Sequence, residues 1–150
     1  FGERLECYHC HGGFNFTDNL QHVRTPFAEV GFHNTGLYNE DGKGRYPAAA
    51  PGIVEFTGEA ADAGRFRTPS LRGVKDTAPY MHAGQLKTLA EVVEFYARGG
   101  DASGFAGTKD PLIVAVVLTA EEKSDLVAFL EQLSATDALP AALIMDTSGQ

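Results

Sequence analysis

Apolar residues recur at helical spacing in the second half of the chain. One stretch follows the i, i+3, i+4, i+7 pattern of an amphipathic helix, at Leu89, Val92, Val93 and Tyr96. Thr88 can cap this helix and Glu91 can complete a capping box. Gly99-Gly100 can end it, because glycine readily takes the left-handed conformation. The pattern predicts a helix from about 88 to 98 whose inward face includes Tyr96.

Two further helices are predicted. One begins at Thr119, with Glu122 as its capping-box partner, and ends before Pro140. Its buried stripe is formed by Leu126, Val127, Leu130 and Leu133. The other is short and amphipathic, runs from roughly Gly2 through Cys10, and ends at Gly12-Gly13.

Residues 14 to 81 show no sustained period. Turn signals are dense there, with a short hairpin among them: Asn34-Thr35-Gly36, Asp41-Gly42, Pro51-Gly52 and Ala63-Gly64. Such a long irregular stretch is uncommon in a compact domain unless it wraps a cofactor. The predicted fold is therefore mainly α, with long loops around a bound group.

Composition limits the classes of function. The 150 residues suit one domain, with 43% hydrophobic and 21% charged residues. No apolar run is long enough to span a bilayer. The formal charge of −8, without a basic cluster, disfavours nucleic-acid binding. We expect a soluble protein with a small-molecule or protein partner.

The motif Cys7-Tyr8-His9-Cys10-His11 is typical of covalent c-type haem attachment. On a helix, residues 7, 10 and 11 share one face, so both thiols can meet the vinyl groups while His11 binds iron. A zinc site would normally recruit four ligands, and a redox dithiol would follow a strand in a βαβ unit. A disulfide across two residues would be strained. Haem c is the favoured interpretation, and zinc, dithiol and disulfide are weaker alternatives.

A haem would provide the apolar plate around which the irregular middle packs. The iron then has an open distal face or a sixth ligand. The candidates are Met81, Met145, Tyr96, His22, His33 and His82. Met81 is the default, because Met with His is a common ligand pair. Covalent haem attachment takes place outside the bacterial cytoplasm, so we expect a periplasmic location.

The run FRTPSLR at 66–72, TAPYMHAG at 77–84 and TLAEVV at 88–93 follow the cysteine motif in that order. Together they resemble the C-terminal haem half of the bacterial di-haem cytochrome c peroxidase and MauG family, over nearly the whole chain. Ala83 departs from that pattern, since the family usually has Asp or Asn there. The resemblance implies a cytochrome c-like domain with one covalent haem.

The resemblance also implies a sixth ligand on the helix after PYMH, fourteen residues beyond its histidine. Met occupies that position in the peroxidases and Tyr in the MauG-type enzymes. Here it is Tyr96. The alternatives are that Tyr96 is a core tyrosine or that Met81 is the ligand. A phenolate favours ferric and higher states, whereas a thioether favours ferrous iron. The implied activity is oxidation of a protein side chain or a small cytochrome with hydrogen peroxide, which would react at a partner haem.

Further roles are implied by the same resemblance. Backbone carbonyls of Thr77 and Pro79 are expected to bind calcium, and His82 to lie near the inter-haem region as a catalytic polar group. Arg67 and Arg72 are expected to pair with haem propionates. The stretch GFHNTGLYN at 31–39 is similar to a subgroup that includes enzymes associated with methanobactin and copper handling. His33 in that stretch would contact the haem edge or remain a loop histidine.

The family carries two CxxCH motifs, whereas this chain carries one. The start at FGERL, without an export signal, favours a processed or partial chain whose N-terminal haem half lies elsewhere. The alternative is a free-standing monohaem electron-transfer cytochrome without enzymatic activity. We expect a redox protein or protein substrate as the other partner.

Overall fold

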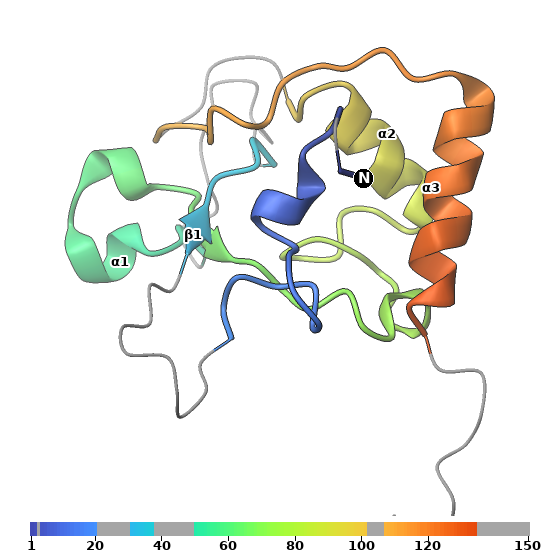
Figure 1. Ribbon diagram of the computed structural model, residues 1–150. Coiled ribbons are helices and arrows are strands. Elements are labelled where there is room, and N and C mark those ends of the chain that lie inside the picture. The colour runs from blue at the N-terminus through green and yellow to red at the C-terminus, as the bar shows by residue number, and fades with distance from the viewer. Residues whose placement is uncertain (3, 21–30, 38–49, 102–106, 135–150) are drawn as a thin grey trace, which may run out of the picture.

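The structure is a computed structural model that describes residues 1–2, 4–20, 31–37, 50–101 and 107–134. Helical elements dominate it, and loops separate them (Figure 1). In chain order the elements are η1 (Cys7–His9), β1 (Phe32–His33), α1 (Val54–Thr57), η2 (Ala60–Asp62), β2 (Phe66–Arg67), η3 (Val74–Asp76), α2 (Leu89–Ala97) and α3 (Ala120–Gln132). The prediction of a mainly helical, loop-rich fold is confirmed for these residues.

Helix α2 begins with the predicted capping box. The Thr88 hydroxyl accepts a hydrogen bond from the Glu91 backbone N–H at 3.1 Å, and the Glu91 carboxylate accepts one from the Thr88 N–H at 2.9 Å. Both N–H groups would otherwise lack a partner in the first turn. The helix gives way to Gly99 and Gly100, which both have positive φ. The start and the end of this helix were therefore predicted correctly, and Leu89 and Val93 are buried as predicted. The deeply buried Phe95 lies outside the predicted stripe.

Helix α3 has an equivalent cap at Thr119, whose N–H donates to the Glu122 carboxylate at 2.8 Å. Its apolar stripe packs against α2 and η3. The core cluster consists of buried Leu89, Val93 and Leu130, with Leu71, Val74, Tyr80, Leu126, Val127 and Leu133 against it. All four residues of the predicted α3 stripe thus contribute to the core.

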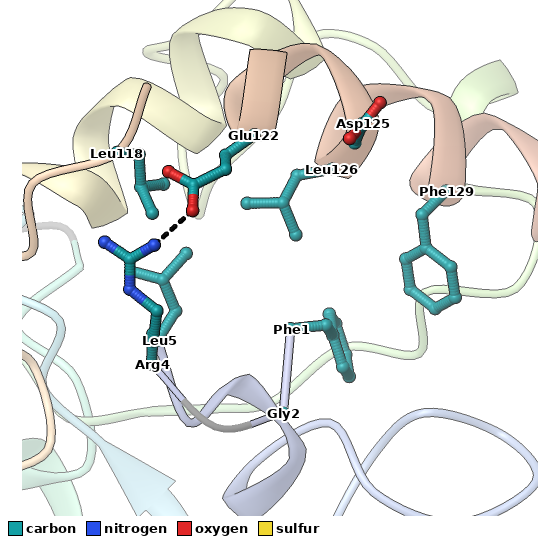
Figure 2. A pocket seen from close by; sticks show the side chains of 9 residues that line it. All are labelled: Phe1, Gly2, Arg4, Leu5, Leu118, Glu122, Asp125, Leu126 and Phe129. Carbon is teal, nitrogen blue, oxygen red and sulfur yellow. Dashed lines mark hydrogen bonds and ion pairs between the residues drawn. The ribbon is translucent and has the colours of Figure 1, made fainter. Parts of the chain in front are cut away.

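The predicted helix from Gly2 through Cys10 is wrong. Only the turn of 3₁₀-helix η1 forms there, because Glu6 takes a left-handed conformation with φ of 51°. The N-terminal segment instead lies against α3 (Figure 2), where the Arg4 guanidinium pairs with the Glu122 carboxylate. The rings of Phe1 and Phe129 also lie 5.0 Å apart. Contacts with α3 therefore position the cysteine motif.

The irregular middle is tied together by one two-stranded antiparallel ladder. β1 pairs with β2, with Phe32 opposite Arg67 and His33 opposite Phe66. This joins two distant segments and is not the short hairpin that we predicted. The Asn34-Thr35-Gly36 turn forms as expected, because the buried Asn34 side chain accepts a hydrogen bond from the Gly36 N–H at 2.8 Å.

None of the helices in the described ranges has both the length and the apolar character needed to cross a bilayer.

Candidate functional site

A cavity of about 370 Å³ lies between the cysteine motif and the inner faces of α2 and α3. Apolar side chains from both helices, from η3 and from the loop before it form most of its wall, among them Leu71, Val74, Leu89, Val92, Val93, Leu126 and Leu130. Cys7, Cys10, His11 and Tyr96 also border it. The arrangement suits a large apolar group with a small number of polar attachment points.

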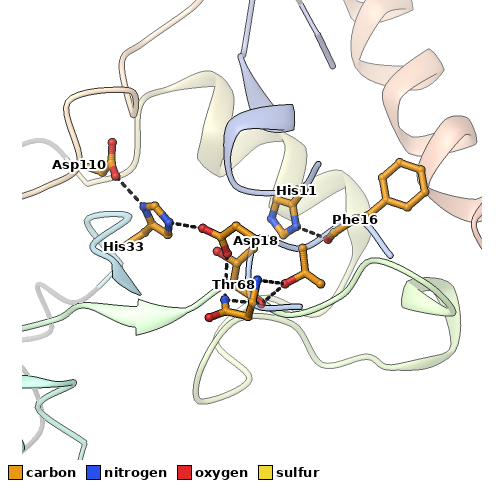
Figure 3. A network of polar contacts seen from close by, with 8 residues as sticks. His11, Phe16, Asp18, His33, Thr68 and Asp110 are labelled. Carbon is orange, nitrogen blue, oxygen red and sulfur yellow. Dashed lines mark hydrogen bonds and ion pairs between the residues drawn. The ribbon is translucent and has the colours of Figure 1, made fainter. Parts of the chain in front are cut away.

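His11 is held in one orientation by a backbone carbonyl. Its Nδ1 lies 3.0 Å from the Phe16 carbonyl oxygen (Figure 3), so Nδ1–H donates and Nε2 is left as the acceptor. Burial lowers the pKa of His11, which favours the neutral ring. A neutral imidazole whose second nitrogen is fixed by a carbonyl is the usual arrangement of a metal-bound histidine.

Both cysteines are free and half-buried, which disagrees with the disulfide alternative. Burial is the main reason that the pKa of the Cys7 thiol is raised, and the neighbouring Cys10 adds to it. The two thiols and His11 border one cavity even though η1 is only one turn long. The CxxCH spacing therefore brings these three groups together without the helix that we predicted.

Tyr96 lies on the cavity side of α2 and is half-buried. Its hydroxyl makes no hydrogen bond to any described residue. Burial, and then the nearby Cys7 and Cys10, raise the pKa of this hydroxyl above its usual range. Met81 borders the same cavity. The geometry therefore places both Tyr96 and Met81 at the cavity, with Tyr96 close to the attachment cysteines.

These observations fit a covalently attached haem. Two thiols, one oriented imidazole and one phenol that makes no hydrogen bond within the described ranges border a single apolar cavity. A haem would offer a bonding partner to each of these groups. Two of the remaining ligand candidates, His22 and Met145, lie outside the described residues.

The remaining predicted site residues occupy different positions. His82 borders the cavity, and its ring stacks on that of Phe66 with centroids 3.8 Å apart. Arg67 also borders the cavity, with its guanidinium 5.4 Å from the centroid of the Phe32 ring. Both are therefore within the site.

Arg72 does not line the cavity. Its Nε–H donates to the Phe14 carbonyl at 2.9 Å, and its guanidinium lies over the rings of Phe14 and Phe16 at 4.6 Å and 4.9 Å. The two arginines that we expected to pair with propionates are thus placed differently, because Arg67 borders the cavity and Arg72 does not.

Thr77 and Pro79, the predicted calcium ligands, are exposed at the surface after η3. The Thr77 hydroxyl donates to the Val74 carbonyl at 2.9 Å. Hard carbonyl oxygens suit calcium, but two of them do not complete a coordination shell.

The 66–72 segment holds the loop that follows the cysteine motif. The Thr68 carbonyl accepts hydrogen bonds from the Thr17 hydroxyl at 2.8 Å and from the Asn19 amide at 3.1 Å (Figure 3). The Ser70 hydroxyl donates to the Asn15 carbonyl at 2.6 Å. This segment therefore supports the loop whose Phe16 carbonyl orients His11.

His33 was predicted to contact the haem edge or to be a loop histidine, and its actual partners were missed. Its Nε2 lies 2.6 Å from Asp18 and its Nδ1 lies 2.8 Å from Asp110 (Figure 3). Hydrogen bonds to Cys10, Asp110 and Asp18 outweigh burial and raise the pKa of His33 to about 10. No spacing in the sequence signals this contact among residues 18, 33 and 110. Because both ring nitrogens are engaged, His33 is a poor candidate for the sixth ligand.

The zinc alternative finds partial geometric support. Cys10, Asp18 and His33 offer ligand atoms within 4.8 Å of one another. Three ligands fall short of the four typical of a structural zinc site. Haem attachment would also convert the Cys10 thiol into a thioether, which removes its thiolate from such a set.

No protein-family model matches the chain. Individual relatives do. The chain is 38% identical over 152 residues to the cytochrome-c peroxidase IdrP1 of Pseudomonas sp. (strain SCT), covering 93% of this chain and 39% of the relative. It is 32% identical over 145 residues to the methylamine utilization protein MauG of Methylorubrum extorquens, covering 97% of this chain and 35% of the relative.

A solved structure agrees with these relatives. The crystal structure of a MauG-like protein associated with microbial copper homeostasis superposes with a TM-score of 0.81 at 49% sequence identity. The match covers 91% of this chain and 41% of that one. The chain belongs to the di-haem cytochrome c peroxidase and MauG family and corresponds to its C-terminal part. It spans about two fifths of the length of the proteins that it matches.

Proposed function

We propose that this chain is the haem c-binding part of a peroxidase-like oxidoreductase that uses hydrogen peroxide to oxidise a protein side chain or a small cytochrome. The observation that carries the proposal is the joint placement of Cys7, Cys10 and His11 at one apolar cavity, with His11 Nε2 left as an acceptor. The relatives named as peroxidases and MauG support the same reaction class.

The haem, when bound, supplies one-electron redox chemistry and storage of oxidising equivalents. Cys7 and Cys10 would attach it covalently, and His11 would bind its iron through Nε2. The Phe16 carbonyl fixes the His11 tautomer, because Nδ1–H donates to it. Tyr96 would provide the sixth ligand as a phenolate, a hard donor that favours ferric and higher states.

A phenol whose pKa is raised stays protonated unless a nearby cation stabilises its phenolate form. Burial and the nearby sulfur atoms raise the pKa of Tyr96 in the protein without haem. A ferric ion would reverse that preference, because a nearby cation favours the anionic form. The same site with Met81 as ligand would suit a monohaem electron carrier, and Met81 also borders the cavity.

Peroxide would react at a second haem carried by the N-terminal part of the family, and the present part would exchange electrons with it. His82 and Arg67 both border the cavity and would serve as polar contacts of the haem, with the His82 ring held by stacking on Phe66. We extend the proposal to a periplasmic location and to calcium bound by Thr77 and Pro79. The similarity at 49% identity to a MauG-like protein associated with copper homeostasis favours a related role in copper handling.

The proposal is tested by producing the protein together with a cytochrome c maturation system and measuring haem per chain with the pyridine haemochrome assay. We expect one covalent haem on this part, a ferric spectrum without a thioether ligand, and reaction with peroxide when the N-terminal haem part is present. One haem with a His/Met spectrum and no peroxide reaction in the complete protein would favour the electron carrier instead.

A further inference from the structure

Asp18, His33 and Asp110 form a compact polar cluster at the edge of the cavity, which we call the Asp–His–Asp cluster. They come from three separate parts of the chain: the loop after the cysteine motif, β1 and the loop before α3 (Figure 3). The imidazole lies between the carboxylates, at 2.6 Å from Asp18 and 2.8 Å from Asp110. His33 and Asp110 border the cavity, and the Cys10 sulfur lies beside His33.

The hydrogen-bond pattern determines the charge of the cluster. Ionised carboxylates only accept hydrogen bonds, so both His33 nitrogens must donate, and only the imidazolium has two N–H groups. One positive and two negative charges leave a net charge of −1. Among the described residues, neither Asp18 nor Asp110 forms an ion pair with a lysine or arginine that would cancel this charge.

The cluster is partly withdrawn from water. The side chains of Asp18 and His33 are each 23% exposed, and that of Asp110 is 16% exposed. Charges in such a position are screened less than charges at the surface, so they act over several ångströms. A group in the cavity therefore experiences their field.

We propose that the Asp–His–Asp cluster holds a fixed negative charge beside the haem attached at Cys10. This charge would lower the reduction potential of the haem. A nearby negative charge favours the oxidised form of the iron, which carries one more positive charge than the reduced form. The cluster would thus reinforce the preference that a Tyr96 ligand gives to ferric and higher states. This inference rests on the proposed haem site.

Asp110→Asn provides the main test. The asparagine oxygen can still accept from His33 Nδ1–H, while the net charge of the cluster changes from −1 to 0. We expect the potential of the haem, measured by spectroelectrochemical titration, to become more positive. Asp110→Glu keeps the charge and should stay close to the wild-type potential.

Asp62→Asn is the matched control. Asp62 also forms an ion pair, with Arg65 at 2.9 Å, and its side chain is 18% exposed, but neither residue borders the cavity. It should therefore shift the potential less than Asp110→Asn does. Equal shifts in the two variants, or no shift in Asp110→Asn, would overturn the proposal.

Asp18→Asn removes the charge from the other side of His33 and should shift the potential in the same direction as Asp110→Asn. If both asparagine variants lose their haem while the wild type and Asp62→Asn retain it, the cluster is only a structural tie and the proposal is wrong. Absence of haem from the wild-type protein would instead refute the proposed function. The haem assay on each variant therefore separates the two failures.

Discussion

Tyr96→Phe removes only the hydroxyl that we assign to the iron. In the protein without haem this hydroxyl makes no hydrogen bond to a described residue, and the half-buried side chain leaves it accessible from the cavity. A fully buried polar group without a partner costs about 1–3 kcal/mol, and this hydroxyl is only partly withdrawn from water, so its removal alone should be neutral or stabilising by less than that amount. If the phenolate binds iron, the same substitution removes a bond, and the haem-loaded protein should become less stable. The two interpretations of Tyr96 therefore differ in the sign of the stability change.

The assay combines ferric absorption spectra with thermal unfolding of the haem-loaded protein. We expect Tyr96→Phe to convert a six-coordinate low-spin spectrum into a five-coordinate or water-bound one, and to lower the unfolding temperature. Tyr80→Phe is the control, because Tyr80 also borders the cavity but its hydroxyl donates to the Lys75 carbonyl at 3.4 Å. It should leave the spectrum unchanged.

An unchanged spectrum in Tyr96→Phe, together with equal or greater stability, would refute the assignment. Met81→Leu should then change the spectrum instead, because Met81 is the other candidate at the cavity.

Three further predictions concern the structure around the site. Gly100→Ala should destabilise the protein by more than Gly58→Ala. Both glycines have φ of +71°, a conformation that costs an L-residue about 1–2 kcal/mol. Only at Gly100 would the new Cβ also lie 2.3 Å from the Thr35 carbonyl oxygen. Equal losses in chemical denaturation would contradict the close contact. Thr88→Ala should lower the free energy of unfolding by about 1 kcal/mol through loss of the α2 cap, and an unchanged denaturation midpoint would contradict that role. The raised pKa of His33 should stabilise the protein fully below pH of about 6.5 and progressively less as pH rises toward about 10. Attachment of haem would convert the Cys10 thiol into a thioether, which removes the contribution of Cys10 to the raised pKa and so narrows this pH range. The stability difference between wild type and His33→Gln should therefore shrink with rising pH, and a constant difference would refute this linkage.

Local signals explain why α2 and α3 could be predicted. In each helix a threonine and a glutamate three residues later form a capping box, and an apolar stripe continues over the following turns. Both signals lie within one stretch of sequence and need no knowledge of distant partners. The position of Tyr96 at the cavity followed from the same period.

Long-range contacts explain what could not be predicted. The apolar and charged residues near the N-terminus resemble a short helix, but Phe1 and Arg4 are held by α3 and Glu6 takes a left-handed conformation. The pairing of β1 with β2 likewise joins segments more than thirty residues apart. Such contacts depend on the tertiary fold, which local sequence patterns do not determine.

The candidate site could likewise be predicted only in part from the sequence. Cys7, Cys10 and His11 could be identified from their spacing alone, and the structure places them at one cavity. The orientation of His11 depends on the Phe16 carbonyl. Every residue has a backbone carbonyl, so the sequence does not indicate which one orients His11. The ion pairs of His33 depend on residues 18 and 110, so they also required the structure.

The most direct test of the account is the intact mass of the protein after co-production with a cytochrome c maturation system, measured after acid and organic extraction of loosely bound haem. We predict that the part described here keeps the added mass of one haem, and that the Cys7→Ala, Cys10→Ala double variant loses it. A chain that carries no covalent haem, or that carries zinc at Cys10 and His33 in its place, would contradict the central claim.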